Sequence, residues 1–216
     1  ASNVNVAYNL GSLDDMLRLL ALESHRHHAV VVGEDLGTVP PEFRARLREA
    51  GVAGMDVLWF QRDGERFQRP AQWRPDAMAM TTTHDLPTVA GWWSGSDIAE
   101  RARLGIVGGE DASAGSASRA MLWRAFVEEG VASADPLKTG DAGAAVNGAL
   151  GFVARSPSPL MVVPAEDLLA RTVQPNLPGT VDEHPNWRRR LPVKADEMLD
   201  DPAVAARVAH IRKERA

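Results

Sequence analysis

Two pairs of polar side chains could carry acid–base chemistry, and each pair directly follows a short run that is typical of a strand. Glu34 and Asp35 follow the valines at 30–32, and His84 and Asp85 follow three threonines. A carboxylate at the mouth of a buried strand is partly desolvated, and its pKa can rise enough for proton donation near neutrality. Two carboxylates at adjoining strand ends are what cleavage of a glycosidic bond uses, because one donates a proton while the other stabilises or attacks the oxocarbenium-like centre.

Structural roles for the same residues remain open. A helix N-cap or a salt bridge to an arginine is the more frequent role for acids such as Glu34 and Asp35, and an isolated histidine such as His84 is more often structural than catalytic. Flat aromatic rings suit the faces of sugars, although a single tryptophan is more often part of a core. The aromatic residues near the two pairs are Trp59, Phe60, Phe67, Trp73, Trp92 and Trp93.

Short apolar runs that alternate with helical periodicity must position these residues. Four runs are predicted to form strands, at 29–32, 55–60, 77–83 and 160–163. Strands that alternate with helices indicate βα units and a parallel sheet. The run 29–32 has no polar face, which is typical of a strand buried on both sides.

Helices are predicted between and after these strands. The first covers 12–26 and starts with a capping-box-like Ser12, and the second begins at the proline pair 40–41 and ends near Gly51. A short helix follows the last strand. Asp201 is expected to cap a C-terminal helix, because its side chain can accept hydrogen bonds from the first unpaired backbone N–H groups.

The stretch 92–156 is too long for a simple crossover, and we expect a helical excursion inserted in one catalytic domain that spans 1–216. Three helices are predicted there, separated by Gly/Ala/Ser-rich breaks at 105–118 and 133–140. A doubly wound nucleotide-binding sheet would need backbone amides after the first strand, where this sequence has carboxylates. The predicted fold class is therefore α/β, with about four parallel strands that form half of a (β/α)8 barrel.

Composition excludes several classes of protein. The 216 residues include 24 basic and 29 acidic side chains, and the net charge of −5 argues against a nucleic-acid or anionic-membrane partner. The absence of cysteine removes disulfides, thiolate nucleophiles and cysteine-ligated zinc. No secretory leader, membrane-length apolar run, paired-histidine metal motif, serine-hydrolase elbow or phosphate loop is found.

Four motifs, in the same order along the chain, resemble the 4-alpha-glucanotransferases (amylomaltase or disproportionating enzyme, glycoside hydrolase family 77). Each is modest alone, and together they are specific. They are Val-Val-Val-Gly-Glu-Asp-Leu-Gly-Thr-Val-Pro at 30–40, Gly-Met-x-Val-Leu-x-Phe at 54–60, Thr-His-Asp at 83–85 with Thr-x-x-Gly-Trp at 88–92, and Asn-Leu-Pro-Gly-Thr at 176–180 with Asn-Trp-Arg at 186–188. The resemblance runs from about residue 7 to the C-terminus.

The resemblance implies roles for individual residues. Glu34 would be the general acid/base and Asp85 the transition-state stabiliser, with His84 beside it binding sugar hydroxyls. Further substrate contacts would come from Asn176, Asp63 and the ring of Trp59. The implied reaction is a retaining transfer of α-1,4-glucan segments between maltodextrins through a covalent glycosyl-enzyme, in the cytoplasm. The resemblance implies no metal and no organic cofactor.

The sequence departs from the family at one point. The family's nucleophile is an aspartate in an Arg-x-Asp-His motif at the end of the fourth barrel strand, and nothing of that form precedes Glu34. The chain is therefore expected to be the C-terminal half of the barrel, inactive without the N-terminal half. Because half a barrel has unpaired sheet edges, the isolated chain is expected to self-associate. A non-catalytic maltodextrin-binding or scaffold module and an α-glucan hydrolase of the same clan remain alternatives.

Overall fold

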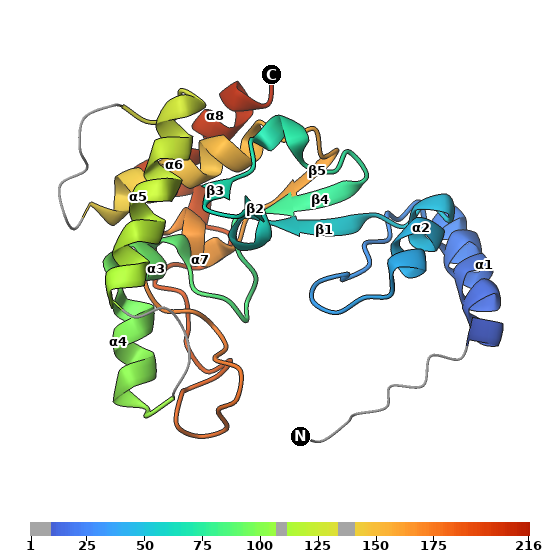
Figure 1. Cartoon of the computed structure of the whole chain (residues 1–216), viewed down its shortest axis with the longest axis horizontal. Helices are drawn as coiled ribbons and strands as arrows, with labels where there is room; N and C mark the ends of the chain where they lie inside the picture. The colour runs from blue at the N-terminus through green and yellow to red at the C-terminus, as the bar shows by residue number, and fades with distance from the viewer. Residues whose placement is uncertain (1–9, 107–111, 134–140) are drawn as a thin grey trace. The chain divides into compact units, whose positions relative to one another are not determined.

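The computed structural model describes residues 10–106, 112–133 and 141–216. The chain divides into two compact units (Figure 1). The first unit consists of Ala1–Met55 and Asp76–Met78, and the second of Asp56–Pro75 and Ala79–Ala216. Two strands of the sheet pass from one unit into the other, so the division does not coincide with the ends of secondary-structure elements.

Two helices build the core of the first unit. Helix α1 spans Leu10–His27 and helix α2 spans Pro41–Glu49, and both confirm predicted helices. Helix α1 begins before Ser12, which is therefore not its cap. The proline at the start of α2 has a φ angle suited to the helix and lacks an N–H that would have no partner there. The helices enclose a small buried cluster formed by Leu17, Leu47 and Val52.

The run 29–32 is not the doubly buried strand that its composition indicates. Within the described part of the chain, its strand pairing is a single parallel bridge between Val32 and Ala53. Val31 packs against the small cluster of the first unit, whereas Val30 is 70% exposed. Side chains alternate between the two faces of an extended segment, and only one face of this segment is covered within the unit.

The sheet has three strands in the described residues, in the order β1-β4-β5. Strand β1 spans Gly54–Val57, β4 spans Ala77–Met80 and β5 spans Leu160–Val162. Figure 1 shows β1 and β4 pointing the same way, with β4 between its two neighbours. The prediction of an α/β protein with a parallel sheet is confirmed.

Two of the strands are shorter than predicted. The run 55–60 leaves the sheet after Val57 and continues as a 3-10 helix, η1, at Leu58–Phe60. The run 77–83 leaves it after Met80, because the threonine hydroxyls that follow bond to loops and to a buried carboxylate. A hairpin of β2 (Arg62–Asp63) and β3 (Arg66–Phe67) was not predicted.

In its described residues, the helical stretch after β4 contains four helices, where three were predicted. They are α3 at Val89–Ser94, α4 at Ser96–Arg103, α5 at Ala112–Glu128 and α6 at Ala142–Ala154. The predicted break at 105–118 is partly wrong, because its second part is the start of α5. Most of the predicted break at 133–140 lies outside the described residues.

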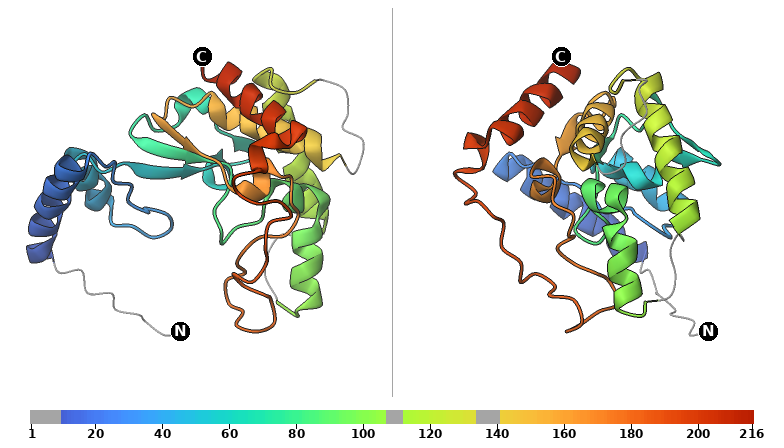
Figure 2. Two further views of the ribbon diagram at one scale, coloured as in Figure 1. Left: turned by 180° about the vertical axis from the view of Figure 1, so that it is seen from behind. Right: turned by 90° about the vertical axis from the view of Figure 1, so that its left-hand side faces the viewer.

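Helix α6 is the centre of the second unit's core. It packs against α3, α5 and α8, the last spanning Pro202–Glu214 (Figure 2). A methyl group on Gly148 would lie 2.6 Å from the ring of Phe126, so the absence of a side chain lets the two helices approach closely. The largest fully buried side chains of this core are Phe126, Phe152, Leu58, Leu122 and Leu150.

The chain after β5 is mostly irregular. A short helix, α7, spans Ala165–Leu168, and it confirms the helix predicted there. The segment 171–190, which we call the strap, has no regular structure and runs along one side of the second unit (Figure 2). A 3-10 helix, η3, at Met198–Asp200 leads to α8. The side chain of Asp201 accepts hydrogen bonds from the backbone of α8, as its sequence context predicts. One further 3-10 helix lies much earlier in the chain: η2, at Pro70–Gln72, connects β3 to β4.

Candidate functional site

The loop between β4 and α3 presents His84 and Asp85. Its base is held by Thr82, whose hydroxyl donates to the carbonyl oxygen of Pro87 at 2.8 Å. The indole N–H of Trp59 donates to the same hydroxyl at 3.1 Å and lies 3.2 Å from the same carbonyl. These bonds close the loop into a compact turn, so the two residues at its tip have a fixed backbone.

The strap holds Asp85 from the other side. The side-chain amide of Asn176 donates to Asp85 Oδ1 at 2.6 Å, and its backbone N–H donates to the carbonyl oxygen of His84 at 3.2 Å. The Asp85 side chain is 46% exposed. In the part of the chain that the structure describes, no group donates to its second oxygen, Oδ2. One carboxylate oxygen is therefore oriented by the protein and the other can accept from a ligand.

One ring lies beside this carboxylate, and a second ring lies beside the first. His84 Nε2 is 3.4 Å from Asp85 Oδ1, and the imidazole ring lies 5.0 Å, centroid to centroid, from the indole ring of Trp187. The structure therefore joins three residues that the sequence predicts, His84, Asp85 and Asn176, and adds Trp187 of the fourth motif.

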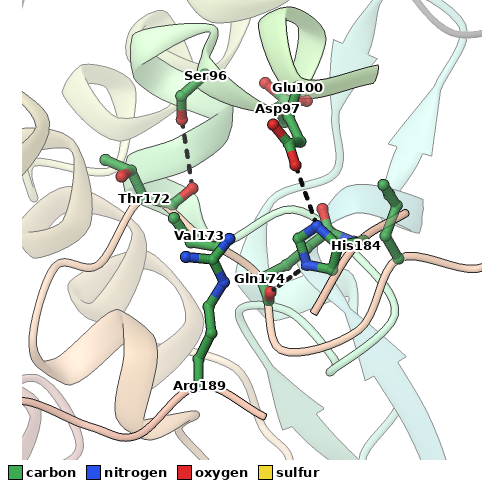
Figure 3. A pocket seen from close by; sticks show the side chains of 9 residues that line it. Ser96, Asp97, Glu100, Thr172, Val173, Gln174, His184 and Arg189 are labelled. Atoms are coloured by element: carbon green, nitrogen blue, oxygen red, sulfur yellow. Dashed lines mark hydrogen bonds and ion pairs between the residues drawn. The ribbon is translucent and has the colours of Figure 1, made fainter. Parts of the chain in front are cut away.

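Gln174 connects the carboxylate loop to a buried network behind it. Its amide donates to the carbonyl oxygen of Asn176 at 2.6 Å and, more weakly, to that of Asp85 at 3.4 Å. The backbone carbonyl oxygen of Gln174 lies 3.3 Å from Nε2 of His184. The histidine is buried, with 1% exposed, and its Nδ1 lies 3.2 Å from Oε1 of Glu100 (Figure 3). The network anchors the strap from behind the site.

A cavity of about 170 Å³ opens beside this network. Hydrogen bonds from Arg103, and then from His184, lower the pKa of Glu100 to about 2. Burial raises the pKa of the neighbouring Asp97. Figure 3 shows the ring of His184 between Glu100 and Gln174, and Arg189 also lines the cavity. His184 and Gln174 were not predicted as site residues, because neither stands at the end of a strand or in a catalytic motif.

The two carboxylates that follow the run 29–32 have different surroundings. Asp35 is 2% exposed, accepts from the backbone N–H of Met55 at 2.9 Å and pairs with Arg44 at 3.1 Å. The structural interpretation of Asp35, a salt bridge to an arginine, is thus confirmed. Glu34 is exposed, so the first unit alone does not provide the desolvation that its position at a strand end indicates. Its placement at a strand end that adjoins the one carrying Asp85 stays a prediction.

The remaining predicted contacts divide between the site and other parts of the molecule. Trp59 supports the base of the Asp85 loop and packs its ring 4.8 Å from that of Trp92. Asp63 is exposed on the β2–β3 hairpin, where it borders a separate cavity of about 480 Å³. Phe67 and Trp73 are core residues, as the structural interpretation predicts. Among the described residues, no group of three or more acidic or histidine side chains could hold a metal ion.

No helix in the three described ranges is both long and apolar enough to cross a membrane.

Comparisons with known proteins agree with the four motifs. The family model of the 4-alpha-glucanotransferases, glycoside hydrolase family 77, matches residues 1–195. Over 212 residues the chain is 34% identical to the 4-alpha-glucanotransferase of Mycobacterium tuberculosis, and this match covers 92% of the chain and 29% of that enzyme. Over 194 residues it is 35% identical to the enzyme of Haemophilus influenzae, with 86% and 28% covered.

The fold agrees as well. The crystal structure of amylomaltase from Corynebacterium glutamicum superposes with a TM-score of 0.80 at 28% sequence identity, which covers 94% of this chain and 31% of that one. The chain thus spans less than a third of the length of these relatives. The family model covers most of the sequence, and the motifs that contain His84, Asp85 and Asn176 lie within the matched residues. The chain therefore belongs to the 4-alpha-glucanotransferase family.

Proposed function

We propose that this chain forms part of the active site of an enzyme that transfers α-1,4-glucan segments between maltodextrins. The observation that carries the proposal is the Asp85 carboxylate, with Oδ1 oriented by Asn176 and Oδ2 left open to a ligand. Such a carboxylate can accept hydrogen bonds from sugar hydroxyls and stabilise the positive charge that develops on the ring in the transition state. His84, beside it, would bind a further hydroxyl.

The proposed reaction proceeds in two steps with retention of configuration. In the first, Glu34 gives its proton to the glycosidic oxygen while a second carboxylate attacks the anomeric carbon, so that the glycosidic bond breaks and a glycosyl-enzyme ester forms. In the second, the ionised Glu34 takes a proton from a hydroxyl of the acceptor sugar, whose oxygen replaces the ester. Asp85 would stabilise the charge in both steps.

The nucleophile in this scheme is proposed to come from outside these 216 residues. A retaining mechanism needs two carboxyl groups about 5–5.5 Å apart across the sugar, and no nucleophile motif precedes Glu34. The three strands and the bridge at Val32 would then be one part of a (β/α)8 barrel, in which catalytic side chains occupy the carboxyl ends of the strands. The chain alone would be inactive.

The experiment compares the chain alone with a chimera in which it replaces the matching third of the Corynebacterium amylomaltase. With maltotriose as substrate, the chain alone is expected to show no redistribution of chain lengths, and the chimera is expected to show it. Glu34→Gln and Asp85→Asn should abolish the activity of the chimera, whereas the exposed control substitutions Glu42→Gln and Asp196→Asn should not.

Each other outcome has a defined meaning. Robust disproportionation by the isolated chain would contradict the missing-nucleophile proposal. Release of glucose without longer products would indicate a hydrolase. A chimera that binds maltoheptaose and never turns it over would favour a binding or scaffold module.

A further inference from the structure

Trp187 is the most exposed of the six tryptophans. Its side chain is 65% exposed, whereas the other five are buried or half-buried. The described residue that shares a ring contact with it is His84, at 5.0 Å between centroids and 49° between planes. The ring therefore gains little from burial in the second unit, and its ring partner among the described residues, His84, lies 3.4 Å from Asp85 Oδ1.

The backbone of Trp187 has an unfavourable conformation. Its φ angle is +59°, in the left-handed region that glycine adopts readily and a bulky side chain rarely does. Strain of this kind persists where the surrounding structure imposes it, and it concentrates at ligand-binding and active sites.

Hydrogen bonds on both sides of the residue impose this conformation. The backbone N–H of Trp187 donates to the carbonyl oxygen of Pro175 at 3.0 Å, next to Asn176. The side chain of Asn186 accepts from the backbone N–H of Leu177 at 2.9 Å and donates to the hydroxyl of Thr180 at 2.9 Å. Residues 175–177 and 186–187 of the strap are thus fixed together, and the ring of Trp187 is held beside His84, the neighbour of Asp85, without being buried.

We infer that Trp187 is a binding platform on which a glucosyl unit of an α-1,4-glucan stacks while its hydroxyls reach Asp85. The inference rests on the proposed function and names a residue of the same site. An indole ring offers a flat apolar face, as a sugar does on its C–H side, and Trp tolerates partial exposure because one edge is polar. The open Oδ2 of Asp85 and the ring of His84 lie alongside to accept or donate hydrogen bonds at the sugar's edge.

The test measures binding of maltoheptaose to the 216-residue chain by titration calorimetry and by tryptophan fluorescence. Trp187→Ala is expected to weaken binding about tenfold, and Trp187→Phe by less, because the smaller ring keeps part of the stacking surface. The change in tryptophan emission that accompanies binding should disappear in Trp187→Phe. Val181→Ala, at another exposed position on the strap, should bind as the wild type does.

A second readout separates a binding role from a structural one. Trp187→Gly removes the strain at positive φ, so its Tm should rise by about 2–4 °C while its affinity falls as in Trp187→Ala. A fall in Tm together with affinity would assign Trp187 a structural role and overturn the inference.

The binding results also separate the inference from the proposed function. Unchanged affinity in Trp187→Ala, with loss of binding in Asp85→Asn, would overturn the inference and leave the proposed function standing. Unchanged affinity in both variants would overturn both. Because the proposed active site includes residues outside this chain, a wild-type chain that does not bind maltoheptaose moves the measurement to the chimera, where a Trp187→Ala variant that binds as the parent chimera does would overturn the inference.

Discussion

Asp167 provides the sharpest test of how this fold is held together around its site. Its side chain is fully buried, with 0% exposed. The hydroxyl of Thr81 donates to Oδ2, and the backbone N–H of Val89 donates to Oδ1 at 2.8 Å. The carboxylate therefore joins the end of β4, the start of α3 and helix α7. Burial nevertheless outweighs these two donors and raises the pKa of Asp167 to about 6 from its ordinary 3.8.

The sign of the pH effect follows from this raised pKa. The folded state binds the proton more tightly than the unfolded chain does, so the contribution of Asp167 to stability is fully present below pH 3.8 and is lost as the pH rises through 6. The whole shift corresponds to about 3 kcal/mol, and about 1 kcal/mol of it falls between pH 5 and pH 7.

Asp167→Asn removes the titration and keeps the shape of the side chain. Its amide oxygen can accept from Val89, and its amide nitrogen can donate to the hydroxyl of Thr81, which is also an acceptor. We therefore expect this variant to be more stable than the wild type at pH 7, by about 1–3 kcal/mol, with a flatter pH dependence between 4 and 7. Asp167→Ala leaves both donors buried and unpaired, and each unpaired group should cost about 1–3 kcal/mol.

Urea unfolding followed by far-UV circular dichroism at pH 5 and pH 7 measures these differences. The exposed Asp196→Asn serves as the matched control, and it should follow the wild type at both pH values. Parallel pH dependence in the wild type and Asp167→Asn would refute the reasoning, because it would mean that Asp167 does not bind a proton differently in the folded state. An Asn variant that is less stable than the wild type at pH 7 would refute it equally.

Two further predictions concern the strap and the sheet. A methyl group at Gly91 would lie 2.3 Å from the carbonyl oxygen of Thr172, so Gly91→Ala must displace the start of the strap. We expect this variant to lose about 1–3 kcal/mol of stability in urea unfolding and to bind maltoheptaose more weakly in calorimetry. The control Gly143→Ala, whose methyl would meet its nearest atom at 3.5 Å, should change neither stability nor binding. The sheet edges that part of a barrel leaves unpaired should drive self-association of the isolated chain, and sedimentation velocity that shows a monomer at high micromolar concentration would contradict this expectation.

Local sequence signals predicted the helices and the approximate strand positions well, because these depend on periodicity and capping. The proline at the start of α2 and the Asp201 cap of α8 both occur where the sequence places them. The strand ends were less predictable. At 81–83 the threonines continue the β-prone composition of the run, yet their hydroxyls bond to Pro87 and Asp167, and the second of these partners is 86 residues away.

The site shows the same contrast. The motifs identified His84, Asp85 and Asn176, and the structure brings these three together. His184 and Gln174, which lie behind them, were not predicted. They contribute through burial and hydrogen bonds to main-chain atoms, and no sequence motif or residue spacing marks such a role. The prediction of a doubly buried strand at 29–32 was wrong within the first unit, since composition indicates what a segment could cover and not which neighbours are present to cover it.

The strap is held in place by hydrogen bonds from uncharged side-chain amides and not by the backbone hydrogen bonds of a helix or a β-sheet. Gln174, Asn176 and Asn186 each serve as donors to oxygen atoms, and two of these oxygens belong to Asp85. Deamidation of such a side chain to a carboxylic acid would keep its shape but remove its N–H donors. At Asn176, deamidation would replace the N–H that now donates to Asp85 Oδ1 with a carboxylate oxygen. Two negatively charged carboxylates would then face each other at hydrogen-bonding distance. The durability of the site therefore depends on the slow chemistry of its carboxamides as much as on the stability of the fold.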